Sequence, residues 1–328
     1  IGAESRRRVA ATPRFAFETR TRTRSRQCLA HARPTDTIVS HWEPALRSMR
    51  EAGDGLYGPK SFIRYLQEHG LDPSQYRTAA ELSVDTRSAL PDRLAEQDTM
   101  VLPVGRATDG PGTGFALVCV PGRLDDFFLD ELAFRADGRE TLDYAPDGDD
   151  TRALDQEARE LLDVYRSLPT FSKTGFVNFA LSTGLLSRAL DLDVDRLGTA
   201  PATVASSFDF EFEPHPDRST VLHHNDGQLG IDTLVTSRRH GERVLLVVVA
   251  KCGARVALAK HTVAYPTLAA ESLSLDVDRV VPVYLRARPV SAGVRYSIYE
   301  CSGVPTGSER PCLAAMNVVD DSHYEVRV

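Results

Sequence analysis

The hydrophobic pattern of the first half of the chain predicts short helices and one strand pair. Ser61 precedes apolar residues at helical spacing, so it is the expected N-cap of a helix that ends at Gly70. Two strand-like runs flank a Gly- and Pro-rich connection over 105–114, which predicts a hairpin with a long loop. The elements expected here are helices over 41–49, 61–68 and 78–82, and strands over 99–104 and 115–120.

The second half of the chain begins with longer segments of helical periodicity, and strand-like segments follow them. The stretch 244–250 is entirely apolar, as expected for a strand at the centre of a buried sheet, and 238–242 reads as the hairpin turn before it. The tail from 303 onward gives little signal. The expected helices span 151–168, 171–190 and 257–272. The expected strands span 203–212, 229–236, 244–250 and 279–286, with an edge strand over 296–299.

Three parts are expected along the chain. The stretch 137–150 is acidic and contains Gly and Pro, so we expect a domain boundary there. The predicted parts are a leader over 1–35, an N-terminal α+β domain over 36–150 and a C-terminal α/β domain over 151–328.

Composition excludes several classes of protein. The longest apolar run is far shorter than the roughly 20 residues of a membrane-spanning helix. The five cysteines are widely spaced and form no CxxC pair, which argues against a disulfide scaffold and a structural zinc site, and predicts thiols in a reducing cytoplasm. Four Lys stand against 35 Arg, and 28 Asp against 18 Glu, a bias typical of an extreme halophile or of a GC-rich genome.

Charge is distributed unevenly along the chain. Residues 1–34 hold nine Arg and two acids, so a leader of net charge +7 precedes a body of −14. This segment lacks the apolar region of a secretory signal. One interpretation is a basic arm that binds nucleic acid. The other, which we favour, is an unstructured leader, and whether it is translated in the native protein is left open.

The main chemical signal is a carboxylate and an ammonium on neighbouring strands. Asp232 lies on the strand before the predicted turn, and Lys251 ends the apolar strand after it, which places both at one end of an antiparallel pair. Such a carboxylate can hold Mg²⁺, and the lysine can orient a metal-bound water. A surface ion pair is the plain alternative. The apolar strand and the scarcity of Lys favour a site, because Arg would serve most surface roles equally well.

Residues around this pair resemble the PD-(D/E)XK nuclease superfamily over roughly 150–300. The resemblance rests on Asn225-Asp-Gly-Gln-Leu-Gly-Ile-Asp232, on Val249-Ala-Lys251 and on Lys260-His-Thr-Val-Ala-Tyr-Pro266. It implies a restriction-endonuclease-like core, a mixed central sheet flanked by helices, behind the N-terminal α+β domain. It also implies a DNA endonuclease that uses Mg²⁺ or Mn²⁺ to hydrolyse phosphodiester bonds in defence or repair. Asp232 would bind the metal and Lys251 would position water, with Gln228, Lys260, His261 and Glu213 as supporting candidates.

Two positions depart from the superfamily pattern. Val249 stands where an acid is expected, and Gly230 where an acid is common. We therefore expect the site to hold Mg²⁺ more weakly, unless an acid from another position in the chain, a migrated acid, supplies the missing carboxylate. The alternative function is therefore a catalytically inactive nuclease-fold protein that binds nucleic acid or a partner protein. An unrelated α/β protein and a homodimeric assembly also stay open. The candidates for a migrated acid are Glu157, Glu160, Glu211 and Glu213.

Other potential motifs are weaker. The adjacent pair His223 and His224 would point to opposite faces of a strand, which disfavours a shared metal. The glycine-rich stretch 105–114 has neither a following helix nor the lysine of a phosphate-binding loop.

Overall fold

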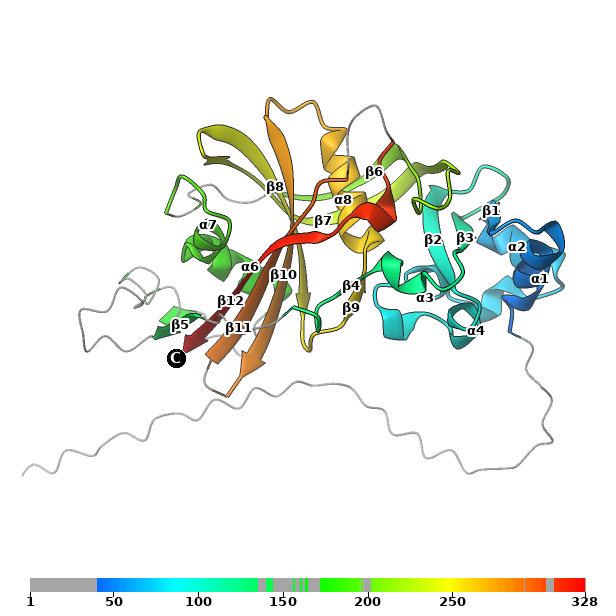
Figure 1. The fold of residues 1–328 in the computed structure, drawn as a ribbon, viewed down its shortest axis with the longest axis horizontal. Helices are drawn as coiled ribbons and strands as arrows, with labels where there is room; N and C mark the ends of the chain where they lie inside the picture. The colour runs from blue at the N-terminus through cyan, green and yellow to red at the C-terminus, as the bar shows by residue number, and fades with distance from the viewer. Residues whose placement is uncertain are drawn as a thin grey trace, which may run out of the picture.

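The structure is a computed structural model, and the residues that it describes form helices around one large sheet (Figure 1). The described residues are 40–134, 140–143, 156, 160, 163, 164, 172–195, 197, 202–291, 293–304 and 310–327. The helices are α1 (Glu43–Ala52), α2 (Phe62–Glu68), α3 (Thr78–Leu82), α4 (Asp92–Ala95), α6 (Lys173–Ser182), α7 (Leu185–Ala189) and α8 (His261–Glu271).

The strands belong to two sheets. In the first half of the chain they are β1 (Leu56–Ser61), β2 (Thr99–Arg106), β3 (Thr113–Cys119), β4 (Phe128–Asp130) and β5 (Glu140–Asp143). In the second half they are β6 (Ala202–Phe212), β7 (Leu222–Arg239), β8 (Glu242–Cys252), β9 (Ala257–Ala259), β10 (Arg279–Val290), β11 (Gly293–Cys301) and β12 (Val318–Arg327). The large sheet runs β1-β3-β2-β7-β8-β10-β11-β12-β5, with β6 paired to β7, and β4 pairs with β9 separately. The chain is therefore of the α/β class, with a mixed parallel and antiparallel sheet flanked by helices.

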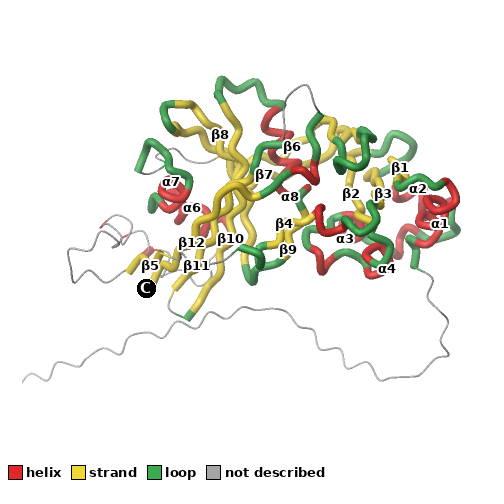
Figure 2. Tube along the Cα trace, viewed as in Figure 1, coloured by secondary structure: helices red, strands yellow, loops and turns green. Residues whose placement is uncertain are grey.

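The N-terminal elements follow their local signals. The hydroxyl of Ser61 accepts a hydrogen bond from the backbone N–H of Arg64 at 3.2 Å, so the predicted N-cap of α2 is confirmed. The predicted hairpin is also confirmed, because β2 and β3 pair antiparallel across the glycine-rich loop. In Figure 2 the strands run through the middle of the molecule, and short helices surround the N-terminal hairpin.

Strand β8 lies at the centre of a three-layer arrangement. Val244, Leu246 and Val248 pack in one core with α6 and α7, whereas Leu245 and Val247 pack in another core with the end of α8. Figure 1 shows α8 on one side of β8 and β10, and α6 and α7 on the other. Both faces of β8 are therefore buried, which confirms the prediction from its unbroken apolar run.

Several boundaries differ from the predicted ones. The helix expected over 257–272 begins only at His261, because 257–259 pairs as β9 with β4. The helix expected over 171–190 is divided into α6 and α7 at Gly184, whose φ of 77° lies in the left-handed region. The edge strand expected over 296–299 is β11, which lies inside the sheet between β10 and β12. Strand β7 begins at Leu222, earlier than the predicted 229.

Some predictions fall outside the described residues. The leader 1–35 does so entirely, and so does most of the helix over 151–168, although 156, 160, 163 and 164 are described and helical. The boundary expected over 137–150 includes β5, which pairs with β12. The division into an N-terminal and a C-terminal domain stays a prediction.

The two halves of the large sheet meet at one residue pair. Gly105 of β2 pairs in parallel with Asn225 of β7. Gly105 has a φ of 75°, and a Cβ built there would lie 2.3 Å from the carbonyl oxygen of Asn225, so only glycine fits. One hydrophobic core also contains residues from both halves, including Trp42 and Tyr265. The junction is thus close-packed.

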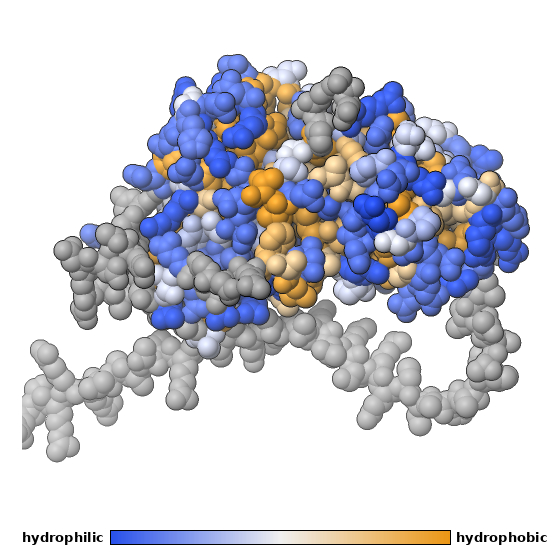
Figure 3. Space-filling model, in the orientation of Figure 1, coloured by the Kyte–Doolittle hydropathy of each residue, from blue (hydrophilic) through white to orange (hydrophobic). Residues whose placement is uncertain are grey.

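The visible surface is largely polar, and the described cysteines are unpaired. Polar residues cover most of the face shown in Figure 3, and hydrophobic residues reach it mainly near its centre. Among the described residues, none of the helices has the length and apolar character needed to cross a bilayer. The four cysteines in the described part, Cys119, Cys252, Cys301 and Cys312, are free thiols.

Candidate functional site

Asp232 lies where β7 stops pairing with β8. The register of the two strands begins at Thr233 opposite Val248, which brings Asp232 beside the end of β8. Its Oδ2 accepts a hydrogen bond from the backbone N–H of Ala250 at 3.0 Å. Its Oδ1 forms an ion pair with the Nζ of Lys173, the first residue of α6, at 2.5 Å. Both carboxylate oxygens therefore already have partners.

Lys251 lies at the same end of this strand pair but has a different counterion. Its Nζ is 2.8 Å from the Oδ2 of Asp85, in the segment that follows α3. Within the described residues, the two side chains predicted to act together are thus each paired elsewhere, Asp232 with Lys173 and Lys251 with Asp85. Their catalytic roles stay predictions.

The donor set around Asp232 does not fit Mg²⁺. Magnesium prefers several oxygen ligands, usually with more than one carboxylate or with substrate phosphates. Here one carboxylate is neutralised by Lys173, and neither Val249 nor Gly230 offers a side-chain oxygen. In the part of the chain that the structure describes, no three His, Cys, Asp or Glu side chains gather as a metal site.

The candidates for a migrated acid have other partners or lie outside the described residues. Glu211 is half-exposed and lies 3.4 Å from the Nδ1 of His223. The side chain of Glu160 accepts a hydrogen bond from Gln156, and Glu157 is outside the described residues. Glu213 joins a small backbone pairing with the segment 311–313.

The contacts of Lys260 indicate a structural role. Its side chain is buried, and its Nζ donates a hydrogen bond to the carbonyl of Ala314 at 2.7 Å. Burial lowers the pKa of this ammonium. A compact ammonium fits this position better than a guanidinium, which accounts for one of the four lysines without invoking catalysis.

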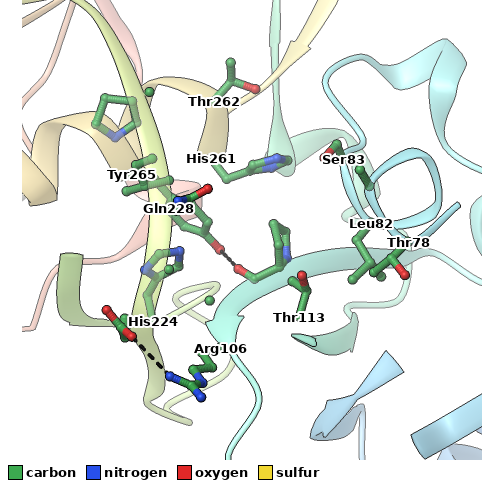
Figure 4. A pocket seen from close by; sticks show the side chains of 18 of the residues that line it. Thr78, Leu82, Ser83, Arg106, Thr113, His224, Gln228, His261, Thr262 and Tyr265 are labelled. Atoms are coloured by element: carbon green, nitrogen blue, oxygen red, sulfur yellow. Dashed lines mark hydrogen bonds and ion pairs between the residues drawn. The ribbon is translucent and has the colours of Figure 1, made fainter. Parts of the chain in front are cut away.

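Gln228 and His261 meet at a cavity of about 660 Å³ at the junction of the two half-sheets. Figure 4 shows that its walls come from both sides: Thr78, Leu82 and Ser83 face His224, Gln228 and His261. The remaining lining residues are Ala79, Asp85, Pro103, Gly105, Arg106, Gly112, Thr113, Asp226, Gly227, Leu229, Gly230, Thr262, Tyr265 and Pro266. Asp85, the partner of Lys251, is among them, so this cavity adjoins the predicted site.

Two buried histidines line the cavity as neutral groups. Burial lowers the pKa of His261 to about 4, and it also lowers the pKa of His224. The Nδ1 of His224 lies 3.2 Å from the carbonyl of Phe208 and must donate there, which leaves Nε2 as an acceptor. Sequence reasoning placed His223 and His224 on opposite faces, and this is confirmed, because His223 is exposed and His224 is buried. It did not identify His224 as a cavity residue.

A second cluster lies where β10 and β11 approach their connecting turn. We call it the arginine hollow, a small depression of about 40 Å³ lined by Gly253, Arg255, Arg286, Arg288, Arg295, Tyr296 and Ser297. Arg286 pairs with Glu131 and Arg295 with Glu325. Within the described residues, neither Arg255 nor Arg288 has a carboxylate partner.

No family model, curated protein or solved structure matches this chain.

Proposed function

We propose that this protein binds nucleic acid, with DNA as the expected partner, and that its nuclease-like core does not hydrolyse it. The observation that carries this proposal is the arginine hollow. Arg288 stands directly opposite Arg295 across β10 and β11. Like charges in directly opposed positions destabilise a sheet pair. Glu325 neutralises Arg295, so Arg288 is the member of this pair whose charge lacks a carboxylate among the described residues, and an external anion could supply one.

The environment of Arg255 supports the same conclusion. One terminal nitrogen donates to the carbonyl of Phe134 at 2.7 Å and to the hydroxyl of Tyr299 at 3.2 Å. Its Nε is buried without a hydrogen-bond partner in the described part of the chain. The chain holds 46 acids against 39 basic residues, yet none of the described acids reaches Arg255 or Arg288. A backbone phosphate would supply the missing charge with paired oxygens, which is the geometry that arginine prefers.

The order of elements supports a nuclease-like core. Strands β6, β7 and β8 are antiparallel neighbours, α8 follows, and β10 then pairs in parallel with β8. This is the order that the sequence resemblance expects, with Asp232 in the middle of β7, where its pairing with β8 ends, and Lys251 near the end of β8. The Lys173 ion pair argues against hydrolysis, because a metal ion would have to displace this ammonium from Asp232, and the described residues bring no second carboxylate to form a metal site there.

Replacing both Arg255 and Arg288 with Ser should weaken DNA binding and reduce its salt dependence. Loss of two phosphate contacts should lower the magnitude of the slope of log K against log salt by about 2. Fluorescence anisotropy with a labelled duplex, measured from low to moderate salt, would show this. Arg243→Ser is the matched control, since Arg243 is half-exposed and pairs with Asp276 at the opposite end of β8. Equal affinity and equal slope for the double variant and the native protein would contradict the proposal.

The metal-dependent endonuclease is the second candidate, and it is separated from the first by a cleavage assay. Supercoiled plasmid incubated with the protein in Mg²⁺ or Mn²⁺, at low and high salt, should remain uncut over the background. Asp232→Asn and Lys251→Ala should then leave the result unchanged. Metal-dependent cleavage that disappears in Asp232→Asn but survives in Asp276→Asn would overturn the non-hydrolytic part of the proposal.

A further inference from the structure

The cavity at the junction has the dimensions of a small-molecule site. Its volume of about 660 Å³ falls within the range of about 300–1,000 Å³ that is common for such sites. It is separate from the arginine hollow, with which it shares no lining residue. The Asp232 carboxylate does not line it either. The proposed function therefore leaves this cavity unassigned.

Three polar groups of the lining, the side chains of His224, His261 and Gln228, are uncharged. His224 presents Nε2 as an acceptor, and His261 is neutral at pH 7 because its burial opposes protonation. The side-chain amide of Gln228 has no hydrogen-bond partner among the described residues, so it offers two donors and an acceptor. These groups can recognise a ligand that carries hydrogen-bonding groups but no charge.

The charged groups of the lining are already paired. At the mouth, Arg106 lies 3.7 Å from the carboxylate of Asp226, and both are largely exposed (Figure 4). Asp85 pairs with Lys251. A charged ligand in the interior would gain little from these groups, whereas an uncharged ligand disturbs neither pair.

The remaining walls suit a flat ring. Leu82, Leu229, Pro103 and Pro266 supply apolar surface, and Tyr265 lies between the two histidines, with ring centroids 5.3 Å from His224 and 5.4 Å from His261. A flat, uncharged ring with donors and acceptors on its edge is the chemistry of a nucleobase.

We propose that the cavity binds a nucleobase, and adenine above the others. A glutamine amide pairs in a bidentate manner with the N6 and N7 atoms of adenine, which gives Gln228 the selective role. The base belongs either to a free nucleoside or nucleotide, or to a strand that presents it out of its stack. Only the second source rests on the proposed function.

The test uses one variant that fills the cavity. A Cβ at Gly230 would meet nothing within 4 Å, and its backbone is not left-handed, so Gly230→Trp should fold and occupy the space. Gly303→Trp is the matched control, because Gly303 is equally unobstructed and lies away from the cavity. Calorimetric titration with adenosine should show binding to the native protein and to Gly303→Trp, with at least tenfold weaker binding to Gly230→Trp.

Two further experiments test the selectivity of the cavity for adenine and whether the bound base comes from a strand or from a free nucleoside or nucleotide. Gln228→Met should reduce the preference for adenosine over guanosine at least fivefold while the cavity remains. A duplex containing 2-aminopurine should become several-fold more fluorescent on binding if the base comes from a strand, and Gly230→Trp should abolish that rise. Adenosine binding without the fluorescence rise assigns the cavity to a free nucleoside or nucleotide.

Two results would overturn this assignment. One is the absence of both adenosine binding and the 2-aminopurine signal in the native protein. The other is equal adenosine binding by Gly230→Trp and Gly303→Trp. By contrast, adenosine binding by a protein that fails to bind DNA would refute the proposed function and leave the nucleobase site standing.

Discussion

Glu131→Gln is expected to destabilise the protein by about 3–5 kcal/mol, because it leaves a buried guanidinium without its counterion. Glu131 is 1% exposed, and Arg286 is 5% exposed. The two oxygens of Glu131 accept hydrogen bonds from Arg286 Nη2 at 2.5 Å and Nε at 3.1 Å, and from the hydroxyl of Tyr284 at 2.5 Å. A neutral amide of the same shape keeps the volume but loses the charge, so packing changes cannot explain the effect.

Urea unfolding at pH 7 measures this loss. Glu68→Gln is the control for an ordinary pair, since Glu68 is partly exposed and ion pairs at the surface contribute at most about 1 kcal/mol. The triple variant Glu131→Leu with Arg286→Met and Tyr284→Phe should recover most of the stability, because apolar residues replace the ion pair and the hydroxyl that is bonded to it. A loss below about 1 kcal/mol for Glu131→Gln would refute the description of Arg286 as a buried, compensated charge. The same pair explains why the DNA-binding test changes Arg255 and Arg288 and spares Arg286.

The second large effect is a loss of stability on acidification that depends on His261. The pKa of His261 is about 4 in the folded protein, against 6.5 for the unperturbed group. Between these values the unfolded chain binds the proton and the folded protein does not, so stability falls as the pH falls below 6.5. Above 6.5 both states are neutral and the contribution is flat. From pH 7 to pH 5, His261 should account for about 2 kcal/mol of the loss.

The measurement compares urea unfolding of the native protein and His261→Asn at pH 7 and pH 5. Other groups also titrate in this range, but they are common to both proteins and cancel in the difference. His223→Asn is the control, because the His223 side chain is 57% exposed. A native protein and a His261→Asn variant that lose equal stability between the two pH values would contradict the neutral state of His261, and with it the uncharged lining of the cavity.

Much of the sheet could be predicted because its signals are local. The unbroken apolar run of β8 predicts that both faces of this strand are buried. Ser61 predicts the start of a helix, and the glycine-rich loop predicts a hairpin. Strands β9 and β12 could not be found in this way. β9 has only three residues and owes its conformation to pairing with β4, and β12 reads as a polar segment until β11 and β5 are placed beside it.

In the candidate site, too, the features that depend on local sequence could be predicted, and those that depend on contacts distant in sequence could not. The hairpin pattern was enough to place Asp232 and Lys251 near one end of the stretch where β7 and β8 pair, although β7 itself extends further back, to Leu222. Their counterions were not predictable, because Lys173 and Asp85 reach them from α6 and from the segment after α3, far away in sequence. Gln228 and His261 were singled out through the resemblance, but the cavity that unites them depends on how the N-terminal hairpin docks against β7.

Because the cavity lies at the junction of Gly105 and Asn225, a ligand bound in it would affect how firmly the two half-sheets are held together. A single strand pairing links the two half-sheets there, and the cavity walls come from both of them. A molecule held in the cavity would contact both halves and act as a clamp, since separating them would first require its release. Its free concentration relative to Kd would then set how strongly the junction resists opening. Occupancy of the cavity and the orientation of the N-terminal hairpin would thus be thermodynamically linked, so each could report on the other.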